Sequence, residues 1–351
     1  YTQNAFAASP VKLTKKHIAG GIIKALVVNS GNANACTGLQ GEINALKTAT
    51  LIANKLGIAT EEVAVASTGV IGQQLDMEKM EFGIEEVTSK LSKEGASDAM
   101  QAIMTTDTYP KEITIECNID GITYTIAGIA KGSGMIHPNM ATMLCFITTD
   151  WPLDQKNLNS CLKEAVEESF NAISVDGDTS TNDMCLLFSS EKLPPLPPEK
   201  LPIFLQGLKI VTGFLAKAIV LDGEGATKLL KISVLGANSE DDAKKAAWSI
   251  AHSPLVKTAF FGEDANWGRV LCAVGYSGCY VDPTKTDLYF GDYQIVKSGE
   301  GTGISDTNLL PVMKSREIPI TLNLNLGNGS YTCQTTDLSY DYVKINGSYR
   351  S

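Results

Sequence analysis

The segment Lys131-Gly-Ser-Gly-Met-Ile-His-Pro-Asn-Met-Ala-Thr-Met-Leu144 carries the residues best suited to covalent chemistry. Small residues precede a turn bent by proline, and Ala141 then abuts Thr142, which opens an apolar run. If the turn strains this peptide bond, the Thr142 hydroxyl can add to the Ala141 carbonyl and form an ester that water hydrolyses. Cleavage between Ala141 and Thr142 would leave a threonine whose free α-amine stands beside its own hydroxyl.

A free α-amine removes the main difficulty of using threonine as a nucleophile. A hydroxyl is a weak nucleophile until a base takes its proton, and an N-terminal amine is a recognised base for this purpose. Its unperturbed pKa is ~8, close to working pH, where a general base is most effective. The ammonium of Lys131 would lower this pKa further. The chain has only 3 histidines, and this mechanism requires no imidazole.

The same residues also fit a purely structural interpretation. Ala141 and Thr142 could simply enter a strand, with the residues after Lys131 forming an ordinary loop. Short motifs match by chance so often that these residues alone favour the structural interpretation. The choice between the two therefore depends on the rest of the chain.

The elements that must position this segment are a mixture of strands and helices. Apolar runs predict strands at residues 22–28, 61–66, 144–147, 183–189 and 229–235. Helical spacing predicts helices at residues 43–56, 77–91, 97–104, 158–170, 204–218 and 241–250, the first of which ends at Gly57. Strict alternation on both sides of Asp120-Gly121 predicts a hairpin over residues 113–126, and a second is expected at residues 318–333. This mixture predicts an α/β protein with an α+β layered sandwich.

Composition limits the class of protein. The chain has 351 residues, 44% of them hydrophobic and 19% charged, which is typical of a soluble globular protein with one two-part body or two domains. We expect no membrane span, because Lys24 interrupts the best apolar run at residues 22–28. The net charge of −10 repels phosphate backbones, so we expect no nucleic-acid partner. A cytoplasmic location follows from these features.

Cysteine and acidic residues give no sign of a metal site. The 8 cysteines form no CxxC pair, and most lie in apolar runs such as the one around Cys272, so we expect reduced, buried thiols. The loop carboxylates of Asp178, Asp183 and Asp264 do not have calcium-loop spacing, and we expect them to be buried hydrogen-bond acceptors. We expect no secretory signal, and we expect that further residues precede Tyr1.

Several segments, in order along the chain, resemble the signatures of the bifunctional ornithine acetyltransferase/N-acetylglutamate synthase family. Its members cleave themselves before the threonine of a Met-Ala-Thr-Met-Leu motif, which this chain has at residues 140–144. A chance match along the whole chain is hard to credit, so the resemblance outweighs the structural interpretation of Thr142. The other segments are Asn29-Ser-Gly-Asn-Ala-Asn-Ala-Cys-Thr-Gly38, Ser67-Thr-Gly-Val-Ile-Gly72, Met104-Thr-Thr-Asp-Thr108, Asp176-Gly-Asp-Thr-Ser-Thr-Asn-Asp183, Asp222-Gly-Glu-Gly-Ala-Thr-Lys228, Gly262-Glu-Asp-Ala-Asn-Trp-Gly-Arg269 and Tyr342-Val-Lys-Ile-Asn346.

The resemblance implies a role for each matching residue. Thr142 would be the nucleophile, and the Thr68 hydroxyl and Gly69 N–H would form the oxyanion hole, where one donor is typically worth ~2.7–4 kcal/mol. The substrate-binding positions implied are Thr108, Lys131, Thr142, Glu224, Asn346 and Ser351.

The chemistry of N-acetylornithine suits these residue types. Lys131 can meet an anionic group, Glu224 can accept the side-chain ammonium, and neutral hydrogen bonds are available from Thr108 and Asn346. The family commonly ends in Tyr-Arg-Thr, whereas this chain ends in Tyr349-Arg-Ser351, which keeps the hydroxyl.

The activity implied is acetyl transfer from N2-acetylornithine to glutamate through an ester on Thr142, which recycles acetyl groups in arginine biosynthesis. Residues 1–141 would form an alpha chain and residues 142–351 a beta chain. The two would fold together as one body, in a heterotetramer of two alpha and two beta chains. No cofactor is implied, and the sequence leaves open whether acetyl-CoA is also a donor.

Three alternatives remain open at this stage. The chain could be an amidase or aminopeptidase with an N-terminal nucleophile, in which water takes the acyl group. It could instead be a paralogous acetyltransferase of secondary metabolism. A third alternative is an unprocessed binding or scaffold protein that keeps the fold.

Overall fold

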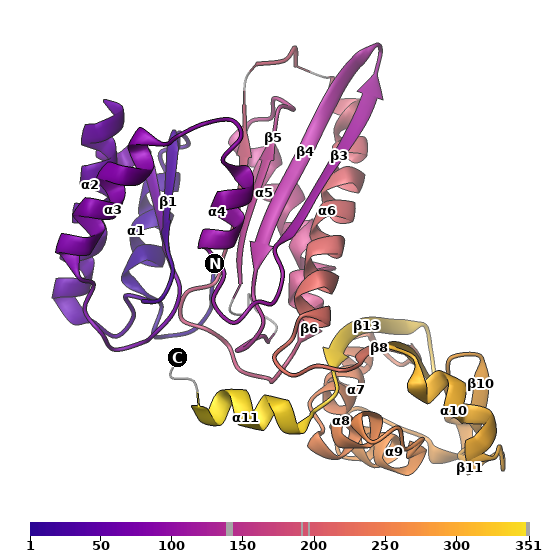
Figure 1. Cartoon of the computed structure of the whole chain (residues 1–351). Coiled ribbons are helices and arrows are strands. Elements are labelled where there is room, and N and C mark those ends of the chain that lie inside the picture. Colours follow the sequence, from indigo (N-terminus) through magenta and orange to yellow (C-terminus); the bar gives the residue numbers. More distant parts are fainter. Residues whose placement is uncertain (138–142, 191, 196, 349–351) are drawn as a thin grey trace. The chain divides into compact units, whose positions relative to one another are not determined.

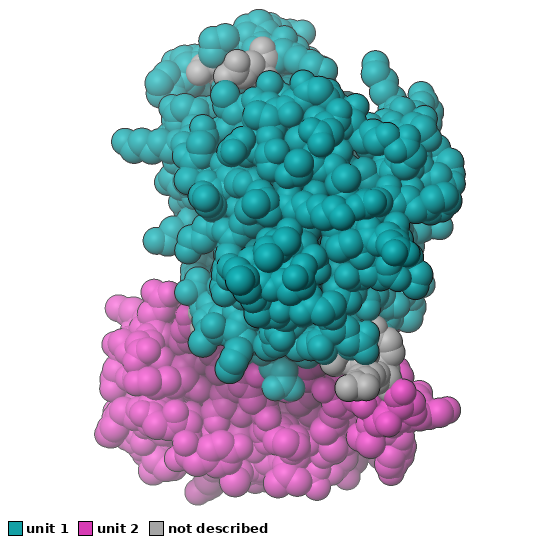
Figure 2. All heavy atoms as spheres, turned by 90° about the vertical axis from the view of Figure 1, so that its left-hand side faces the viewer, with its two compact units in different colours: residues 1–171, 178–219, 350–351 teal, residues 172–177, 220–349 magenta. Residues whose placement is uncertain are grey.

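A computed structural model of the chain describes residues 1–137, 143–190, 192–195 and 197–348 (Figure 1). The chain divides into two compact units, which Figure 2 shows in different colours. Unit 1 contains residues 1–171 and 178–219, and unit 2 contains residues 172–177 and 220–349. The fold is a layered α/β fold, as predicted. The predicted boundary between residues 141 and 142 falls inside unit 1.

Unit 1 combines two small sheets with six helices in its described part. Helix α6 starts in unit 1 and its last two residues belong to unit 2. The elements are α1 (Ser9–Ile18), β1 (Ala25–Asn29), α2 (Gly38–Leu56), β2 (Val63–Ser67), α3 (Met77–Ser89), α4 (Ala96–Ala102), β3 (Lys111–Ile119), β4 (Ile122–Lys131), β5 (Leu144–Thr149), α5 (Gln155–Glu167), β7 (Met184–Ser189) and α6 (Leu201–Leu221).

Unit 2 is built on one larger sheet. Its elements are β6 (Ile173–Ser174), β8 (Leu229–Ala237), α7 (Glu240–Ala251), α8 (Pro254–Phe261), α9 (Trp267–Gly275), β9 (Asp287–Phe290), β10 (Tyr293–Lys297), β11 (Glu300–Gly301), α10 (Asp306–Lys314), β12 (Glu317–Asn323), β13 (Gly329–Thr336) and α11 (Tyr340–Ser348). Short 3-10 turns lie at Thr60–Glu62, Phe170–Ala172, Pro198–Lys200 and Pro283–Lys285.

The four-stranded sheet of unit 1 has the order β3-β4-β5-β7. The predicted hairpin is confirmed: β3 pairs with β4 in antiparallel register from Lys111↔Ala130 to Ile119↔Ile122. β5 then pairs antiparallel with β4 and parallel with β7. Strands from both sides of the predicted cleavage point therefore share one sheet.

Helix α6 lies alongside β3 and β4 (Figure 1). Glycines allow this close approach, since a Cβ at Gly207 would lie 3.0 Å from the side chain of Ile115. A Cβ at Gly128 of β4 would lie 2.9 Å from Val211 of the helix. A larger side chain at either position would push the helix away from the sheet.

The other sheet of unit 1 is the parallel pair β1–β2, which carries α1 and α2. Both strands follow the predicted ones with small shifts at their ends, and α2 ends at Gly57 as predicted, with a left-handed φ of 66°. The Thr14 hydroxyl of α1 donates to the Val65 carbonyl oxygen at 2.7 Å. This bond and a shared apolar cluster fix the end of β2, from which the next loop leaves.

The sheet of unit 2 has the order β11-β10-β9-β12-β8-β13-β6. The hairpin predicted at residues 318–333 is wrong, because β8 lies between β12 and β13. β8 pairs parallel with β12 and antiparallel with β13. Both strands pair with a strand from a distant part of the sequence. The turn residues between β12 and β13 do not indicate such a partner.

The prediction that residues 22–28 are the best apolar run is wrong. The segment Pro198–Leu221 is long and apolar enough to cross a membrane by length and composition alone, and half of its apolar 18-residue stretch is buried inside the protein. Side chains such as Phe204, Leu208 and Leu215 are fully buried. Packing within the protein therefore accounts for the apolar character of that half.

All eight cysteines are free, and four of them, including Cys145 and Cys185, are buried. The prediction that the apolar run around Cys272 buries its thiol is wrong, because Cys272 is exposed on α9. The helix turns its other apolar residues, Val270, Ala273 and Val274, inward. The position of Cys272 between them in the sequence places it on the opposite face.

Lys257 is a buried cation on which unit 2 depends. Its ammonium donates to the carbonyl oxygens of Val175 at 2.9 Å and Thr336 at 2.6 Å, and to the Thr335 hydroxyl at 3.0 Å. Burial lowers the pKa of Lys257 to about 8, although nearby carboxylates raise it. The ammonium therefore connects α8 to the strand β13 and to the segment that follows β6.

We expect Lys257→Met to reduce the free energy of unfolding by about 3 kcal/mol, because its acceptors would be left buried without a donor. Urea denaturation at pH 7 measures this loss. The matched change at the exposed Lys231 of β8 should alter stability by less than about 0.5 kcal/mol. Equal effects of the two substitutions would contradict a structural role for the Lys257 ammonium.

Candidate active site

The loop that follows β2 holds Thr68 and Gly69. Its backbone is fixed on both sides, since the Thr68 N–H donates to the Asn29 carbonyl oxygen at 3.0 Å and the Val70 N–H donates to that of Gly31 at 3.3 Å. Gly69 has a φ of 131°, and a Cβ there would lie 2.2 Å from the Gly31 carbonyl carbon. Only glycine fits at this position. The loop is therefore a rigid platform that presents the Gly69 peptide and the Thr68 side chain.

Lys131, the last residue of β4, reaches this platform. Its ammonium donates to the Thr105 hydroxyl at 2.8 Å and to the Thr68 hydroxyl at 3.5 Å. It also lies 3.7 Å from a carboxylate oxygen of Asp107. The Lys131 side chain is 3% exposed, so this charge is held inside unit 1. The structure thus brings together two of the predicted site residues, Thr68 and Lys131.

Asp107 and Thr108 belong to the loop between α4 and β3. Asp107 is buried, whereas Thr108 beside it in the chain is exposed. The Asp107 carboxylate accepts hydrogen bonds from the Lys111 ammonium and the Gly132 N–H, both at 2.7 Å. The loop that carries Thr108 is therefore fastened to the end of β4 by a buried ionic contact.

The strand that follows Thr142 begins next to a buried carboxyl. The Met143 N–H donates to Asp183 at 3.1 Å, and the Met184 N–H donates to the Met143 carbonyl oxygen at 3.1 Å. The neighbouring Asn182 amide donates to the carbonyl oxygens of Ala33 at 2.6 Å and Ser67 at 2.8 Å. Residues 182 and 183 therefore connect the start of β5 to the loop of Thr68.

Asp183 is fully buried, and its Oδ2 atom has no hydrogen-bond partner in the described part of the chain. Burial raises the pKa of Asp183 well above its usual range, although the Met143 N–H and the Lys131 charge lower it. Burial therefore favours the neutral form of this carboxyl. Its predicted buried hydrogen-bonding role is confirmed, whereas Asp178 and Asp264 are exposed and the prediction is wrong for them.

Glu224 and Asn346 come together within unit 2. The Asn346 amide donates to the Glu224 carboxylate at 2.8 Å and to the Tyr342 carbonyl oxygen at 3.1 Å. Gly225 has a φ of 66°, and a Cβ there would lie 2.4 Å from the Tyr342 backbone nitrogen, so glycine is required beside Glu224. Two segments far apart in the sequence thus place an acid and an amide in contact.

Three predicted site residues, Ala141, Thr142 and Ser351, lie outside the described residues. Sequence reasoning singled out neither Asp107 nor Asn182 as a site residue. Both lie in the segments that carried the family resemblance, in loops rich in hydroxyl, amide and carboxylate side chains. Their place in these segments was a sequence signal for them, whereas their burial and their contacts with the backbone are seen only in the structure.

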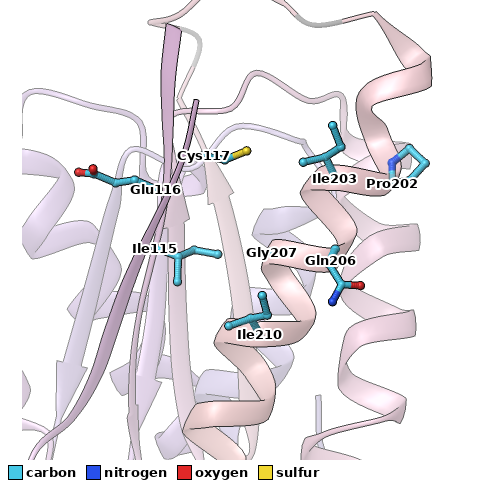
Figure 3. Close-up of a pocket in the computed structure, with 8 residues that line it drawn as sticks. All are labelled: Ile115, Glu116, Cys117, Pro202, Ile203, Gln206, Gly207 and Ile210. Atoms are coloured by element: carbon cyan, nitrogen blue, oxygen red, sulfur yellow. The ribbon is translucent and has the colours of Figure 1, made fainter. Parts of the chain in front are cut away.

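A groove of about 470 Å³ lies elsewhere in unit 1, between β3 and α6 (Figure 3). Ile115 and Cys117 point toward the helix, while Glu116 points away from it (Figure 3). The groove is lined by Ile115, Glu116, Cys117, Pro202, Ile203, Gln206, Gly207 and Ile210, and none of these is a predicted site residue.

A rigid glycine loop with a buried hydroxyl and an adjacent ammonium is suited to hold the oxyanion that forms when an acyl group is transferred. An acyltransferase is the class of enzyme that this fold and these residues define.

Comparison with known proteins agrees with this class. The ArgJ family model matches residues 1–351. The "Arginine biosynthesis bifunctional protein ArgJ" of Symbiobacterium thermophilum is 50% identical, over 100% of this chain and 88% of the relative. The protein of the same name from Geobacter sulfurreducens is 47% identical, over 100% of this chain and 91% of the relative. The crystal structure of the Bacillus halodurans protein is 42% identical, with a TM-score of 0.56 over 58% of this chain and 98% of that chain.

The chain therefore belongs to the ArgJ family, and it is an acetyltransferase of arginine biosynthesis.

The raised pKa of Asp183 leads to a test by pH. The folded protein keeps the proton of this carboxyl to a higher pH than the unfolded chain, which ionises it around a pKa of about 3.9. Folding thus takes up a proton, so stability falls as pH rises above that value, until the folded pKa is reached. In the pH range between the unfolded and the folded pKa, we expect the wild type to lose up to about 1.4 kcal/mol per pH unit more than Asp183→Asn.

Urea denaturation at several pH values measures the two slopes. The same substitution at the exposed Asp98 should leave the wild-type slope unchanged. Parallel curves for the wild type and Asp183→Asn would show that Asp183 is ionised in the folded protein.

Proposed function

We propose that the chain cleaves itself between Ala141 and Thr142 and then moves an acetyl group from N2-acetylornithine to glutamate. The observation that carries this proposal is the contact at 3.5 Å between the buried Lys131 ammonium and the Thr68 hydroxyl. A cation and a hydroxyl held beside Gly69 favour an oxyanion at that place. Such an arrangement supports acyl transfer whether the acyl group comes from the chain itself or from a substrate.

The proposed reaction has two steps, in which the acetyl group moves first to Thr142 and then to glutamate. The Thr142 hydroxyl oxygen attacks the acetamide carbon while the Thr142 α-amine takes the hydroxyl proton. The Thr68 hydroxyl and the Gly69 N–H hold the oxyanion, and its collapse breaks the C–N bond. Ornithine leaves with the proton from the α-amine. The α-amine of glutamate then attacks the ester, forms N-acetylglutamate and returns a proton to the Thr142 oxygen.

The contacts of two further proposed substrate residues, Glu224 and Asn346, suit the donor. Glu224 is 9% exposed, and Asn346 donates to it, so its carboxylate is oriented to accept an ammonium such as that of ornithine. Thr108 and Ser351 are proposed to hold polar groups of the substrate by neutral hydrogen bonds. No cofactor takes part in this scheme, and a second donor such as acetyl-CoA would enter by the same ester.

The sheet of unit 1 supports the proposal that the alpha and beta chains stay associated after cleavage. β4 lies before the proposed cut and β5 after it, and they pair over six residues from Ile126↔Thr149 to Lys131↔Leu144. β5 is also paired with β7, which lies on the same side of the cut. We propose a heterotetramer with two copies of each chain, located in the cytoplasm.

The decisive variant is Thr142→Ala, which removes the hydroxyl needed for both cleavage and transfer. We expect this variant to remain a single chain and to lose acetyl transfer by several orders of magnitude. The matched change at the exposed Thr148 of β5 should cleave and react like the wild type. Denaturing mass spectrometry, before and after incubation with N-acetylornithine, shows the chains and the mass of one acetyl group on the beta chain.

An active, uncut chain or an acetyl group on another residue would overturn the proposal. Release of acetate instead of transfer to glutamate would identify the chain as an amidase with the same nucleophile.

The proposed role of Glu224 gives a separate prediction. Glu224→Gln keeps an acceptor for Asn346 but loses the charge that meets the ornithine ammonium. We expect kcat/KM for N-acetylornithine to fall about 10- to 100-fold, as for other hydrogen bonds to charged groups. The rate with N-acetylnorvaline, which has no side-chain ammonium, should stay within about twofold. Glu300→Gln, at an exposed position, is the control, and equal losses with both donors would contradict this role.

A further inference from the structure

We propose that Asp107 is a positioning residue that holds the Lys131 ammonium against the Thr68 hydroxyl. The inference rests on the acetyl-transfer function proposed above, because it assigns Asp107 a part in that reaction. Among the described residues, Asp107 contacts Thr105, Lys111, Lys131 and Gly132 rather than Thr68 or Gly69, and it would act through Lys131.

Four contacts surround the Asp107 carboxylate. One oxygen accepts from the Lys111 ammonium and from the Gly132 N–H, both at 2.7 Å. The other accepts from the Thr105 N–H at 3.2 Å and lies 3.7 Å from the Lys131 ammonium. The carboxylate therefore contacts Lys131 and two of its neighbours. These are Gly132, which follows Lys131 in the chain, and Thr105, whose hydroxyl accepts a hydrogen bond from the Lys131 ammonium.

The charge of Asp107 suits this place. Its side chain and that of Lys111 are 0% exposed, and the Lys131 side chain is 3% exposed. Burial raises the pKa of Asp107, but the charges of Lys131 and Lys111 and the bonds from Lys111 and Gly132 outweigh burial and hold the pKa below its usual value. The carboxylate is thus ionised at neutral pH and attracts both ammonium groups in an environment where charges interact strongly.

A fixed carboxylate can set the position of the Lys131 ammonium. The lysine side chain is a flexible four-carbon stem with a compact charge, so its position must be set by its partners. Lys111 lies at the start of β3 opposite Ala130, next to Lys131 in the sheet. Without the carboxylate between them, the two ammonium groups would repel each other. Lys111 anchors Asp107, and Asp107 in turn directs Lys131 toward Thr68.

A merely structural role would give a different pattern in a double-mutant cycle. If Asp107 acts through Lys131, its charge should matter only while the lysine is present. If Asp107 only folds the loop of residues 105–108, its loss should reduce activity by the same factor with or without the Lys131 ammonium. The cycle consists of the wild type, Asp107→Asn, Lys131→Met and the variant with both changes.

We expect Asp107→Asn to lower kcat/KM for acetyl transfer about 10- to 100-fold, as expected when a hydrogen bond to a charged group is lost. Lys131→Met should lose at least as much. The variant with both changes should stay within about twofold of Lys131→Met alone. Rates are divided by the concentration of cleaved beta chain, so that incomplete cleavage does not affect the comparison between variants. Asp120→Asn, the same change at the exposed hairpin turn, should behave like the wild type.

The role of Asp107 would be overturned if the losses of kcat/KM in the two single variants multiply in the variant with both changes. It would also be overturned if Asp107→Asn is as active as the wild type. A wild-type protein that transfers no acetyl group would instead overturn the proposed function, so the two failures are distinct. Should Asp107→Asn not fold, Lys111→Met replaces it in the same cycle. Removal of the Lys111 anchor should likewise reduce activity only when Lys131 is present, and multiplying losses there would again refute the inference.

Discussion

The pairing of β4 with β5 is the constraint on which the site in unit 1 depends. β4 ends at Lys131 and β5 begins at Leu144, and these two residues face each other in the register of the sheet. The ammonium that reaches Thr68 and the strand that follows the proposed nucleophile are thereby held at one end of the sheet. A break between them in the chain would leave this pairing in place, because its hydrogen bonds join the strands directly. The sheet can thus keep its register when the peptide bond is lost.

The pKa values of two buried carboxyls in unit 1 shift in opposite directions because their surroundings differ. Asp107 meets two ammonium groups, and its pKa is lowered. Asp183 meets the Met143 N–H, and its pKa is raised by burial. When a pKa changes by one in either direction, the free-energy difference between the protonated and the ionised carboxyl changes by about 1.4 kcal/mol. The same residue type therefore serves as a fixed negative charge at the end of β4 and as a carboxyl whose neutral form is favoured at the start of β5.

Local patterns in the sequence predicted those parts of the fold that depend on local partners. The hairpin at residues 113–126 was predicted correctly, because alternation and the Asp120-Gly121 turn specify a neighbour in the chain. The hairpin at residues 318–333 was not, since β8, which pairs with both strands, lies far away from them in the sequence. For the site, resemblance supplied Thr68 and Lys131, but Asp107 depends on burial between distant segments, which spacing alone does not indicate.

Rigidity is built into the loop of Thr68 by a backbone contact that spacing alone does not reveal. The Gly69 peptide lies so close to Gly31 that a single added carbon would collide with the backbone. The amides on both sides of it are held by Asn29 at the end of β1 and by Gly31 in the loop that follows. Donors that are fixed before the reaction need no reorganisation when negative charge develops. A glycine in a polar loop often serves only to make a turn. Here it brings two loops into contact, so that the parallel pair β1–β2 determines where an oxyanion could be held.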